Sequence, residues 1–239
     1  MSLSVENLSF RYGPKQALDQ VGFALGPGFT ALLGPNGAGK STLFALLTGL
    51  FSARHGRITI AGHDMARSPR AALARMGVVF QQPTLDLDLT VRRNMLYFAA
   101  LHGIWGREAE RRADEALARL GMAERAAEPV RALNGGHRRR MEIARALLHH
   151  PAVLLLDEPT VGLDAAARAA IVAHVHDLAD AGLTVLWATH LTDEIRPADH
   201  LLVLHQGRLR VDARADAFAP EGGLQAAFLD LTTGNGAPQ

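Results

Sequence analysis

The stretch FTALLGPNGAGKST, Phe29 to Thr42, decides the fold, because an apolar run leads into a glycine-rich loop and then into a helix. The loop fits the pattern G-x-x-x-x-G-K-[ST], which is informative when it follows a strand and opens a helix. Its glycines let consecutive backbone N–H groups turn inward around phosphate oxygens, and the helix N-terminus adds partial positive charge. The motif therefore predicts a phosphate-binding loop that opens a helix from Lys40 to Leu47.

Each residue of this loop is a candidate for phosphate binding: Gly34, Pro35, Asn36, Gly37, Ala38, Gly39, Lys40, Ser41 and Thr42. Lys40 would reach the β- and γ-phosphates of a nucleotide, and the Ser41 hydroxyl would be a ligand of Mg²⁺. Lysine occurs only at Lys15 and Lys40, which argues against a chance match at the motif position. The alternative is an ordinary glycine-rich turn, which the flanking strand and helix disfavour.

A second motif is the acidic end of an apolar strand, VLLLDE, Val153 to Glu158. Beside a phosphate loop, Asp157 would hold the metal through water. Glu158 would polarise the water that attacks the γ-phosphate, which is a general-base role. A solvated acidic turn is the alternative, and the paired motif disfavours it.

The order of the elements predicts an α/β fold. Residues 1–33 contain short strand patterns separated by glycine- and proline-containing turns, and residues 90–148 are helical in pattern with Thr90 as an N-cap. The apolar runs 153–157 and 183–188 flank a predicted helix, Ala165 to Ala179, with Asp164 as its N-cap. Strands that alternate with helices in this way indicate a parallel sheet.

Composition limits the classes of protein. The 25 Lys and Arg residues nearly balance 24 Asp and Glu residues, so the net charge of +1 and the absence of a long basic block predict no nucleic-acid partner. The absence of cysteine excludes disulfides and agrees with a cytosolic location. No apolar run approaches the ~20 residues that span a bilayer, and no signal pattern begins the chain, so we expect no direct membrane insertion.

In this order the motifs resemble those of the nucleotide-binding subunit of ATP-binding-cassette (ABC) transporters, over nearly the whole chain. The loop and the acidic strand are similar to Walker A and Walker B. The remaining matches are Tyr12 (adenine-stacking aromatic), Gln81 (Q-loop), Leu133–His137 (signature), Gly162–Asp164 (D-loop) and His190 (switch histidine). Seven ordered motifs are far more specific than any one of them.

The resemblance implies a P-loop NTPase (RecA-like) core with an antiparallel β subdomain and an inserted helical subdomain. It places one ATPase domain over residues 1–227, with the core and β subdomain at 1–82 and 149–227 and the helical subdomain at 83–148. Residues 228–239 are expected to form a disordered tail.

The resemblance also implies the site. Lys40, Glu158 and His190 would be catalytic, with His190 on the γ-phosphate. Ser41, Gln81 and Asp157 would contact Mg²⁺, and Tyr12 would stack on adenine with ~1 to 3 kcal/mol of stacking energy. A second copy of the chain would complete each ATP site with its signature and D-loop residues: Asn134, Gly135, Gly136, His137 and Asp164.

The function implied is ATP binding and hydrolysis in a homodimer that closes on ATP and drives separate transmembrane permease subunits, at the cytoplasmic face of the cell membrane. The variant signature suggests a bacterial exporter and resembles cassettes associated with pyrroloquinoline-quinone-dependent alcohol dehydrogenase systems. The alternatives are a soluble, non-transport ABC ATPase that acts on nucleic acid or ribosomes, and a binding-only cassette. The lack of a long coiled coil or second cassette argues against the non-transport ATPase. The intact Glu158 and His190 argue against the binding-only cassette.

The signature departs from the family's Leu-Ser-Gly-Gly-Gln at Asn134 and His137. The Asn134 amide can still donate a hydrogen bond to phosphate. His137 can become charged near pH 6.5, which predicts hydrolysis that is retained but sensitive to acid. The next residues, Arg138 to Arg140, fan around the helix and are expected to form a solvated or salt-bridged collar. The adjacent pair His149 and His150 lacks the i,i+4 spacing of a metal chelate.

Overall fold

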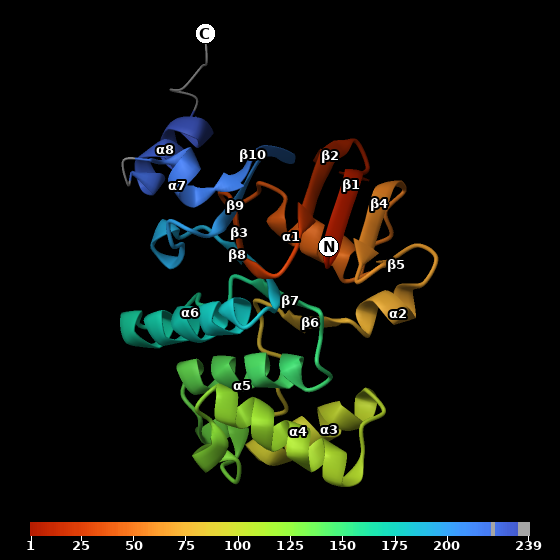
Figure 1. The fold of residues 1–239 in the computed structure, drawn as a ribbon, viewed down its shortest axis with the longest axis vertical. Helices are drawn as coiled ribbons and strands as arrows, with labels where there is room; N and C mark the ends of the chain where they lie inside the picture. Colours follow the sequence, from red (N-terminus) through yellow and green to blue (C-terminus); the bar gives the residue numbers. More distant parts are fainter. Residues whose placement is uncertain (221–222, 234–239) are drawn as a thin grey trace.

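The structure is a computed structural model that describes residues 1–220 and 223–233. One of its two sheets is antiparallel and has the strand order β2-β1-β4-β5. Its strands are β1 (Leu3–Tyr12), β2 (Lys15–Leu25), β4 (His55–Ile60) and β5 (His63–Asp64). This sheet accounts for the strand patterns near the start of the chain and agrees with the predicted antiparallel β part (Figure 1).

The second sheet has the order β10-β9-β3-β8-β7-β6. Its strands are β3 (Gly28–Leu33), β6 (Met76–Val79), β7 (Val153–Asp157), β8 (Thr184–Thr189), β9 (His200–His205) and β10 (Arg208–Arg214). All neighbours pair in parallel except β9 and β10. Since parallel strands end at one edge, the residues after β3, β6, β7 and β8 meet there, where the candidate site lies.

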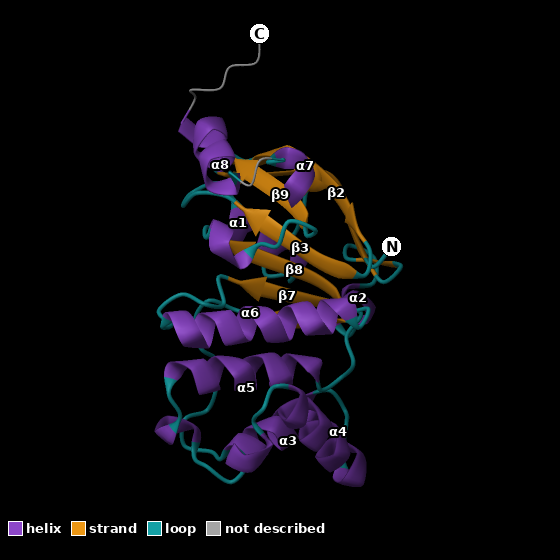
Figure 2. Cartoon of the chain, turned by 60° about the vertical axis from the view of Figure 1, so that its left-hand side comes forward, coloured by secondary structure: helices purple, strands orange, loops and turns teal. Residues whose placement is uncertain are grey.

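Helices cover both faces of this parallel sheet. On one side α1 (Lys40–Leu47) packs in an apolar cluster together with residues of the antiparallel sheet. On the other side lie α6 (Ala165–Asp180) and α5 (Gly135–Leu147), which run side by side in Figure 2. Apolar strands buried on both faces are typical of such a sheet.

The segment between β6 and β7 is largely helical. It contains α3 (Val91–Leu101), α4 (Gly106–Arg119), the short turns η1 (Ala123–Arg125) and η2 (Val130–Ala132), and α5. In Figure 1 these helices lie together at the bottom of the view, away from the antiparallel sheet. The remaining helical pieces are α2 (Pro69–Leu73), η3 (Thr192–Glu194), α7 (Ala215–Phe218) and α8 (Leu224–Thr233).

The predicted helix caps are confirmed. The Thr90 side chain accepts a hydrogen bond from the backbone of Arg93 at 3.2 Å, at the start of α3. Asp164 accepts one from Ala167 at 2.8 Å, at the start of α6. A side-chain oxygen at the N-cap satisfies an amide that has no partner within the helix, which is why these residue types mark helix starts.

The expected start of the disordered tail is wrong. The chain is helical from Leu224 to Thr233, so disorder does not begin at residue 228; residues 234–239 lie outside the described part. The arginines after the signature were expected to be solvated or salt-bridged, and Arg139 takes the second form, because it is only 6% exposed. Its charge is paired inside the protein with Glu142, one turn further along α5.

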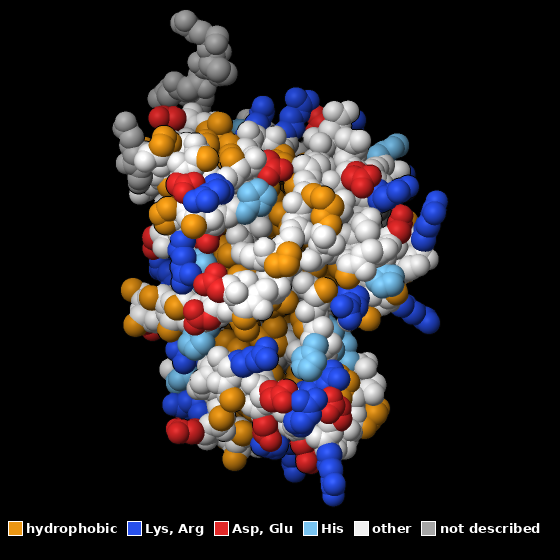
Figure 3. All heavy atoms as spheres, in the orientation of Figure 1, with side chains coloured by type: hydrophobic (Ala, Val, Ile, Leu, Met, Phe, Trp, Pro, Cys, Tyr) orange, Lys and Arg blue, Asp and Glu red, His pale blue; other side chains and the backbone are white. Residues whose placement is uncertain are grey.

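Acidic and basic side chains are intermingled over the face drawn in Figure 3, in keeping with a net charge close to zero. Among the helices that the structure describes, none is both long and apolar enough to cross a membrane.

Candidate functional site

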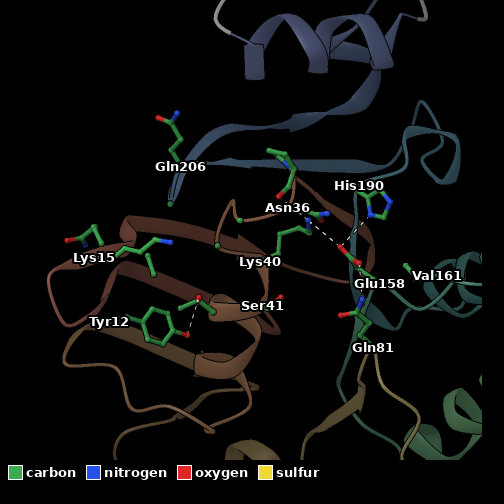
Figure 4. Close-up of a pocket in the computed structure, with 17 residues that line it drawn as sticks. Tyr12, Lys15, Asn36, Lys40, Ser41, Gln81, Glu158, Val161, His190 and Gln206 are labelled. Atoms are coloured by element: carbon green, nitrogen blue, oxygen red, sulfur yellow. Dashed lines mark hydrogen bonds and ion pairs between the residues drawn. The ribbon is translucent and has the colours of Figure 1, made fainter.

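A pocket of about 810 Å³ opens at the carboxyl edge of the parallel sheet, between the two sheets (Figure 4). It is lined by residues of the glycine-rich loop, of the hairpin between β1 and β2, and of the segments after β6, β7, β8 and β9. The lining residues are Tyr12, Lys15, Gln16, Ala17, Pro35, Asn36, Gly37, Gly39, Lys40, Ser41, Thr42, Gln81, Glu158, Val161, His190, Gln206 and Gly207. The pocket thus brings together motifs that lie far apart in the sequence.

Lys40 lies at the floor of this pocket, at the first residue of α1, and is only 5% exposed. Its ammonium donates to the carbonyl of Gly34 at 2.6 Å and lies 3.4 Å from Glu158 Oε1. A buried ammonium needs such acceptors, since its burial would otherwise be costly. The loop carbonyl and the carboxylate therefore hold the charge of Lys40 beside the start of the helix.

The tight path of the loop explains its glycines. A Cβ on Gly34 would lie 2.5 Å from the carbonyl oxygen of Leu204, so the backbone approaches β9 too closely for any side chain. Gly39 has a φ of +114°, a conformation that L side chains rarely adopt. These two glycines are required by the shape of the loop whatever it binds.

Glu158 is the centre of the polar network in the pocket. Besides Lys40, it faces Gln81, whose amide nitrogen donates to Oε2 at 3.4 Å, and His190, whose Nδ1 lies 3.5 Å from Oε1. Figure 4 shows these side chains converging from different segments. Three of the side chains that the sequence singled out for chemistry are therefore gathered around one carboxylate.

The backbone of Glu158 is strained. Its φ of 45° lies in the left-handed region, where a residue other than glycine costs about 1–3 kcal/mol. Its amide donates to the carbonyl of Ala188 in β8 at 3.0 Å, which holds the turn against the neighbouring strand. Strain of this kind at a strand end is typical of functional sites, and here it aims the carboxylate into the pocket.

Asp157, the last residue of β7, is 8% exposed. Burial raises the pKa of its carboxyl, the neighbouring Glu158 raises it further, and Lys40 opposes the rise. Oxygen ligands such as a carboxylate, a hydroxyl and an amide oxygen suit Mg²⁺. Asp157 and the Ser41 hydroxyl fit such an ion by their chemistry. Gln81 fits as well, because its amide nitrogen faces Glu158 and its oxygen stays available.

Tyr12 lies at the outer wall of the pocket and is 47% exposed. Its ring makes edge contacts with Phe10 and Phe51, at centroid distances of 5.1 and 5.8 Å, and its hydroxyl lies 3.4 Å from Thr42 Oγ1. The neighbouring rings support Tyr12 while leaving part of it open. An exposed, supported aromatic ring can stack on a flat base.

The signature residues lie elsewhere. None of Asn134, Gly135, Gly136, His137 or Asp164 is among the residues that line the pocket. Asn134 is the N-cap of α5 and accepts from the His137 amide at 2.8 Å. The sequence reasoning had not foreseen this cap. The cap uses the side-chain oxygen of Asn134. The amide NH₂ of the same side chain is the group that would donate a hydrogen bond to an anion.

The glycines of the signature pack against the start of α6. A Cβ on Gly136 would lie 3.0 Å from the Ala167 side chain, and one on Gly135 would lie 3.2 Å from that of Leu163. Desolvation lowers the pKa of His137, and the charges of Arg125 and Arg140 lower it further. The acid-sensitive range expected for His137 therefore lies below the ordinary histidine value of 6.5.

The sequence reasoning missed Glu194 in η3, which is 2% exposed. Its carboxylate accepts from the Thr160 hydroxyl, and from the Thr189 hydroxyl at 2.5 Å. Thr160 lies two residues after Glu158, and Thr189 directly precedes His190. One buried carboxylate thus joins the two segments that carry pocket residues. No local pattern reveals it, because Thr160 lies 34 residues away in the chain.

The glycine-rich loop, the acidic strand end and the parallel sheet define a P-loop nucleotide-binding ATPase. Residues 18–161 match the family described as ABC transporter. The chain is 39% identical over 224 residues to the daunorubicin resistance ATP-binding protein DrrA3 of Streptomyces coeruleorubidus, covering 93% of this chain and 71% of that protein. It is 40% identical over 223 residues to the Nod factor export ATP-binding protein I of Sinorhizobium fredii (strain NBRC 101917 / NGR234), covering 92% and 65%.

Among solved structures, the ADP conformation of MJ1267, an ATP-binding cassette of an ABC transporter, has a TM-score of 0.82 to this chain. The two are 26% identical, and the match covers 95% of this chain and 98% of that one. The chain belongs to the ABC transporter family as an ATP-binding subunit. It is an ATPase of the kind that is coupled to transport.

Proposed function

We propose that the chain powers an exporter as a homodimer with two ATP sites. The pocket of one copy would hold the nucleotide, and the signature and D-loop residues of the second copy would cover it. The separation of Asn134 from the pocket supports this proposal, because a single chain leaves the signature outside its own site. A second copy can bring the N-terminus of α5, with its partial positive charge, to the γ-phosphate.

Within one site, the glycine-rich loop and Lys40 bind the phosphates, and Tyr12 stacks on the adenine. Glu158 accepts a proton from the attacking water, and His190 hydrogen-bonds the γ-phosphate. The single observation that carries this assignment is the convergence of Lys40, Gln81 and His190 on the Glu158 carboxylate. With nucleotide bound, the γ-phosphate would accept from Lys40 and His190, and the metal would bind the amide oxygen of Gln81.

Mg²⁺ would bind through the Ser41 hydroxyl, the Gln81 amide and Asp157, with phosphate oxygens as its other ligands. In the described part of the chain, no three His, Cys, Asp or Glu side chains cluster as a metal cage. That is the usual situation for Mg²⁺ at nucleotides, where few protein ligands are combined with waters and phosphates.

The partners would be separate transmembrane permease subunits, with this chain at the cytoplasmic face of the membrane. We infer export because one relative is named for drug resistance and another for Nod factor export. The same names favour transport over a soluble ATPase that acts on nucleic acid or ribosomes. In this proposal residues 83–148 form a helical subdomain, and the permease binds in the groove between this subdomain and the core, near Gln81 to Asn94. An association with pyrroloquinoline-quinone-dependent systems stays a prediction.

Glu158→Gln tests the catalytic role. Because general-base catalysis contributes about 10²- to 10⁴-fold, hydrolysis should fall by that order. ATP binding should persist, and light scattering should detect a dimer that forms with ATP and Mg²⁺. Glu110→Gln, at an exposed position of α4, is the matched control and should behave like wild type. A Glu158→Gln variant with a normal rate, or one that stays monomeric with ATP, would contradict the proposal.

A mixing experiment tests the shared site. Lys40→Ala removes the ammonium from one copy's own pocket. Asn134→Asp keeps a side-chain cap on α5 but places a negative charge where the partner's phosphate would lie. Each variant alone should be inactive, whereas a mixture forms heterodimers with one intact site and should recover part of the activity. If the mixture is as inactive as its components, the signature does not act across the dimer.

A further inference from the structure

Helix α5 carries three buried charged side chains that the site described above does not use. Arg139, Glu142 and Arg145 are 6%, 2% and 7% exposed. They are spaced three residues apart, which puts them on neighbouring parts of the helix surface. All three side chains contact the segment of residues 80–84 that leaves β6 and contains Gln81.

Arg139 binds the main chain on both sides of the Gln81 Cα. Its Nη1 donates to the carbonyl of Phe80 at 2.8 Å, and its Nη2 donates to the carbonyl of Gln81 at 2.9 Å. Nη1 also donates to Glu142 Oε2 at 2.8 Å, which orients the guanidinium. A planar fork of fixed donors can hold two neighbouring carbonyls at once, and a lysine ammonium, as a single point charge, lacks this geometry.

The other two side chains hold Thr84. Glu142 Oε1 accepts from the Thr84 amide at 2.9 Å. Arg145 donates to the Thr84 carbonyl at 2.8 Å and also to its hydroxyl. The segment is thus bound near both of its ends by one face of a single helix.

A gain in folding stability does not by itself explain why Arg139, Glu142 and Arg145 are buried together. Burial raises the pKa of Glu142, and the nearby Arg139, the Thr84 amide and Arg145 oppose the rise. Burial likewise lowers the pKa of both arginines. A buried charge network of this kind often stabilises a fold no more than apolar residues of similar volume would, and its value lies in specifying one geometry.

The backbones are also in close contact. A Cβ on Gly77 in β6 would lie 2.4 Å from the carbonyl oxygen of Ala146, so only glycine lets α5 approach the strand this closely. Residues 80–84 therefore leave β6 where α5 is already packed against it. The packing and the hydrogen bonds together leave little room for residues 80–84 to move relative to α5.

We propose that Arg139 is a positioning residue for Gln81, and that Arg139, Glu142 and Arg145 join the Gln81 segment to α5 as one rigid unit. The inference rests on the proposed role of Gln81 at the nucleotide-bound metal. Because α5 begins at Gly135, four residues before Arg139, the same unit includes the start of the signature helix.

The test compares Arg139→Lys with Arg138→Lys in the full chain. Arg138 binds the carbonyls of Val130 and Arg131 and not the Gln81 segment, so it is a matched control. Arg139→Lys should raise the Mg²⁺ concentration for half-maximal ATPase activity about tenfold, with little change in the KM for ATP. Gln81→Ala should do the same, and Arg138→Lys should respond to Mg²⁺ like wild type.

The double variant Gln81→Ala/Arg139→Lys separates positioning from a general loss of structure. If Arg139 acts through Gln81, the double variant should be no worse than Gln81→Ala, since residues of one unit are non-additive. A normal Mg²⁺ response of Gln81→Ala would overturn the proposed role of Gln81 itself. If Gln81→Ala shifts the Mg²⁺ response but Arg139→Lys does not, this inference is overturned while the proposed role of Gln81 stands. The same holds if the effects of the two substitutions on the Mg²⁺ response add in the double variant.

Glu142→Gln gives an independent check, which also serves if Arg139→Lys does not fold. The amide keeps an acceptor for Thr84 but turns a donor toward Arg139, so the guanidinium loses its charged partner. Hydrogen exchange should then speed up both in residues 80–84 and in the first turn of α5. Faster exchange in only one of the two segments would show that they do not move as one unit.

Discussion

Replacing Glu194 by alanine should destabilise the fold strongly, because three buried donors lose their acceptor. Trp187 Nε1 donates to Glu194 Oε2 at 2.9 Å, Thr189 donates to the same oxygen, and Thr160 donates to the other. The threonine hydroxyls can rotate, whereas the indole N–H cannot turn to a new partner. Trp187 is fully buried, so water does not reach it either.

The magnitude follows from the groups that are lost. Removing the buried Cγ methylene costs about 0.8 kcal/mol. Leaving the Trp187 indole unsatisfied costs about 2 kcal/mol more. We expect Glu194→Ala to lower the free energy of unfolding by about 3 kcal/mol and Glu194→Gln by about half of that, since the amide still offers one acceptor oxygen.

Urea unfolding followed by tryptophan fluorescence measures this change, with Asp193→Ala as the control. Asp193 is the neighbouring residue, and its side chain is 66% exposed in a surface ion pair with Arg168. Asp193→Ala should lower the free energy of unfolding by at most about 1 kcal/mol. A Glu194→Ala variant within about 1 kcal/mol of wild type would refute the reasoning, because the three hydrogen bonds would then contribute little.

Three further predictions concern single residues. Burial lowers the pKa of His149 to about 4 from an ordinary 6.5, so the unfolded chain takes up a proton that the folded chain resists. Stability is therefore complete above about pH 6.5 and falls by up to about 3 kcal/mol as the pH drops to 4, and pH-dependent unfolding of His149→Gln should lose this slope. Gly39→Ala should abolish nucleotide binding in calorimetry, since its Cβ would lie 2.9 Å from the Ala17 carbonyl oxygen; an unchanged affinity would mean that the loop can relax. Tyr12→Ala should weaken ATP binding about tenfold while Tyr12→Phe binds normally, as a stacking energy of ~1 to 3 kcal/mol requires.

Much of the site could be predicted because its signals are local. The loop from Gly34 to Thr42 and the strand end at Asp157 and Glu158 each need only a short stretch of chain between a strand and a helix. The caps Thr90 and Asp164 are local for the same reason, since each accepts from an amide three residues ahead. Hydrophobic runs likewise indicate strands buried on both faces without any knowledge of their neighbours.

The buried charges could not be predicted, because the sequence around them resembles that of a solvated helix. Arg138 and Arg139 are adjacent and chemically identical, yet only Arg139 faces residues 80–84, more than 50 positions away. Glu194 follows an exposed aspartate, and its donors come from two other segments. Which of two neighbouring charges is buried depends on what the fold packs against it.

The sequence by itself determined the phosphate loop, the acidic strand end and the parallel α/β architecture, because backbone periodicity and turn chemistry act over a few residues. Tertiary structure alone decided that Lys40, Gln81 and His190 meet at Glu158, and that Arg139 holds the Gln81 main chain. Those contacts join segments separated by tens of residues. They form only when the strands align in register and bring their carboxyl ends to one edge of the sheet.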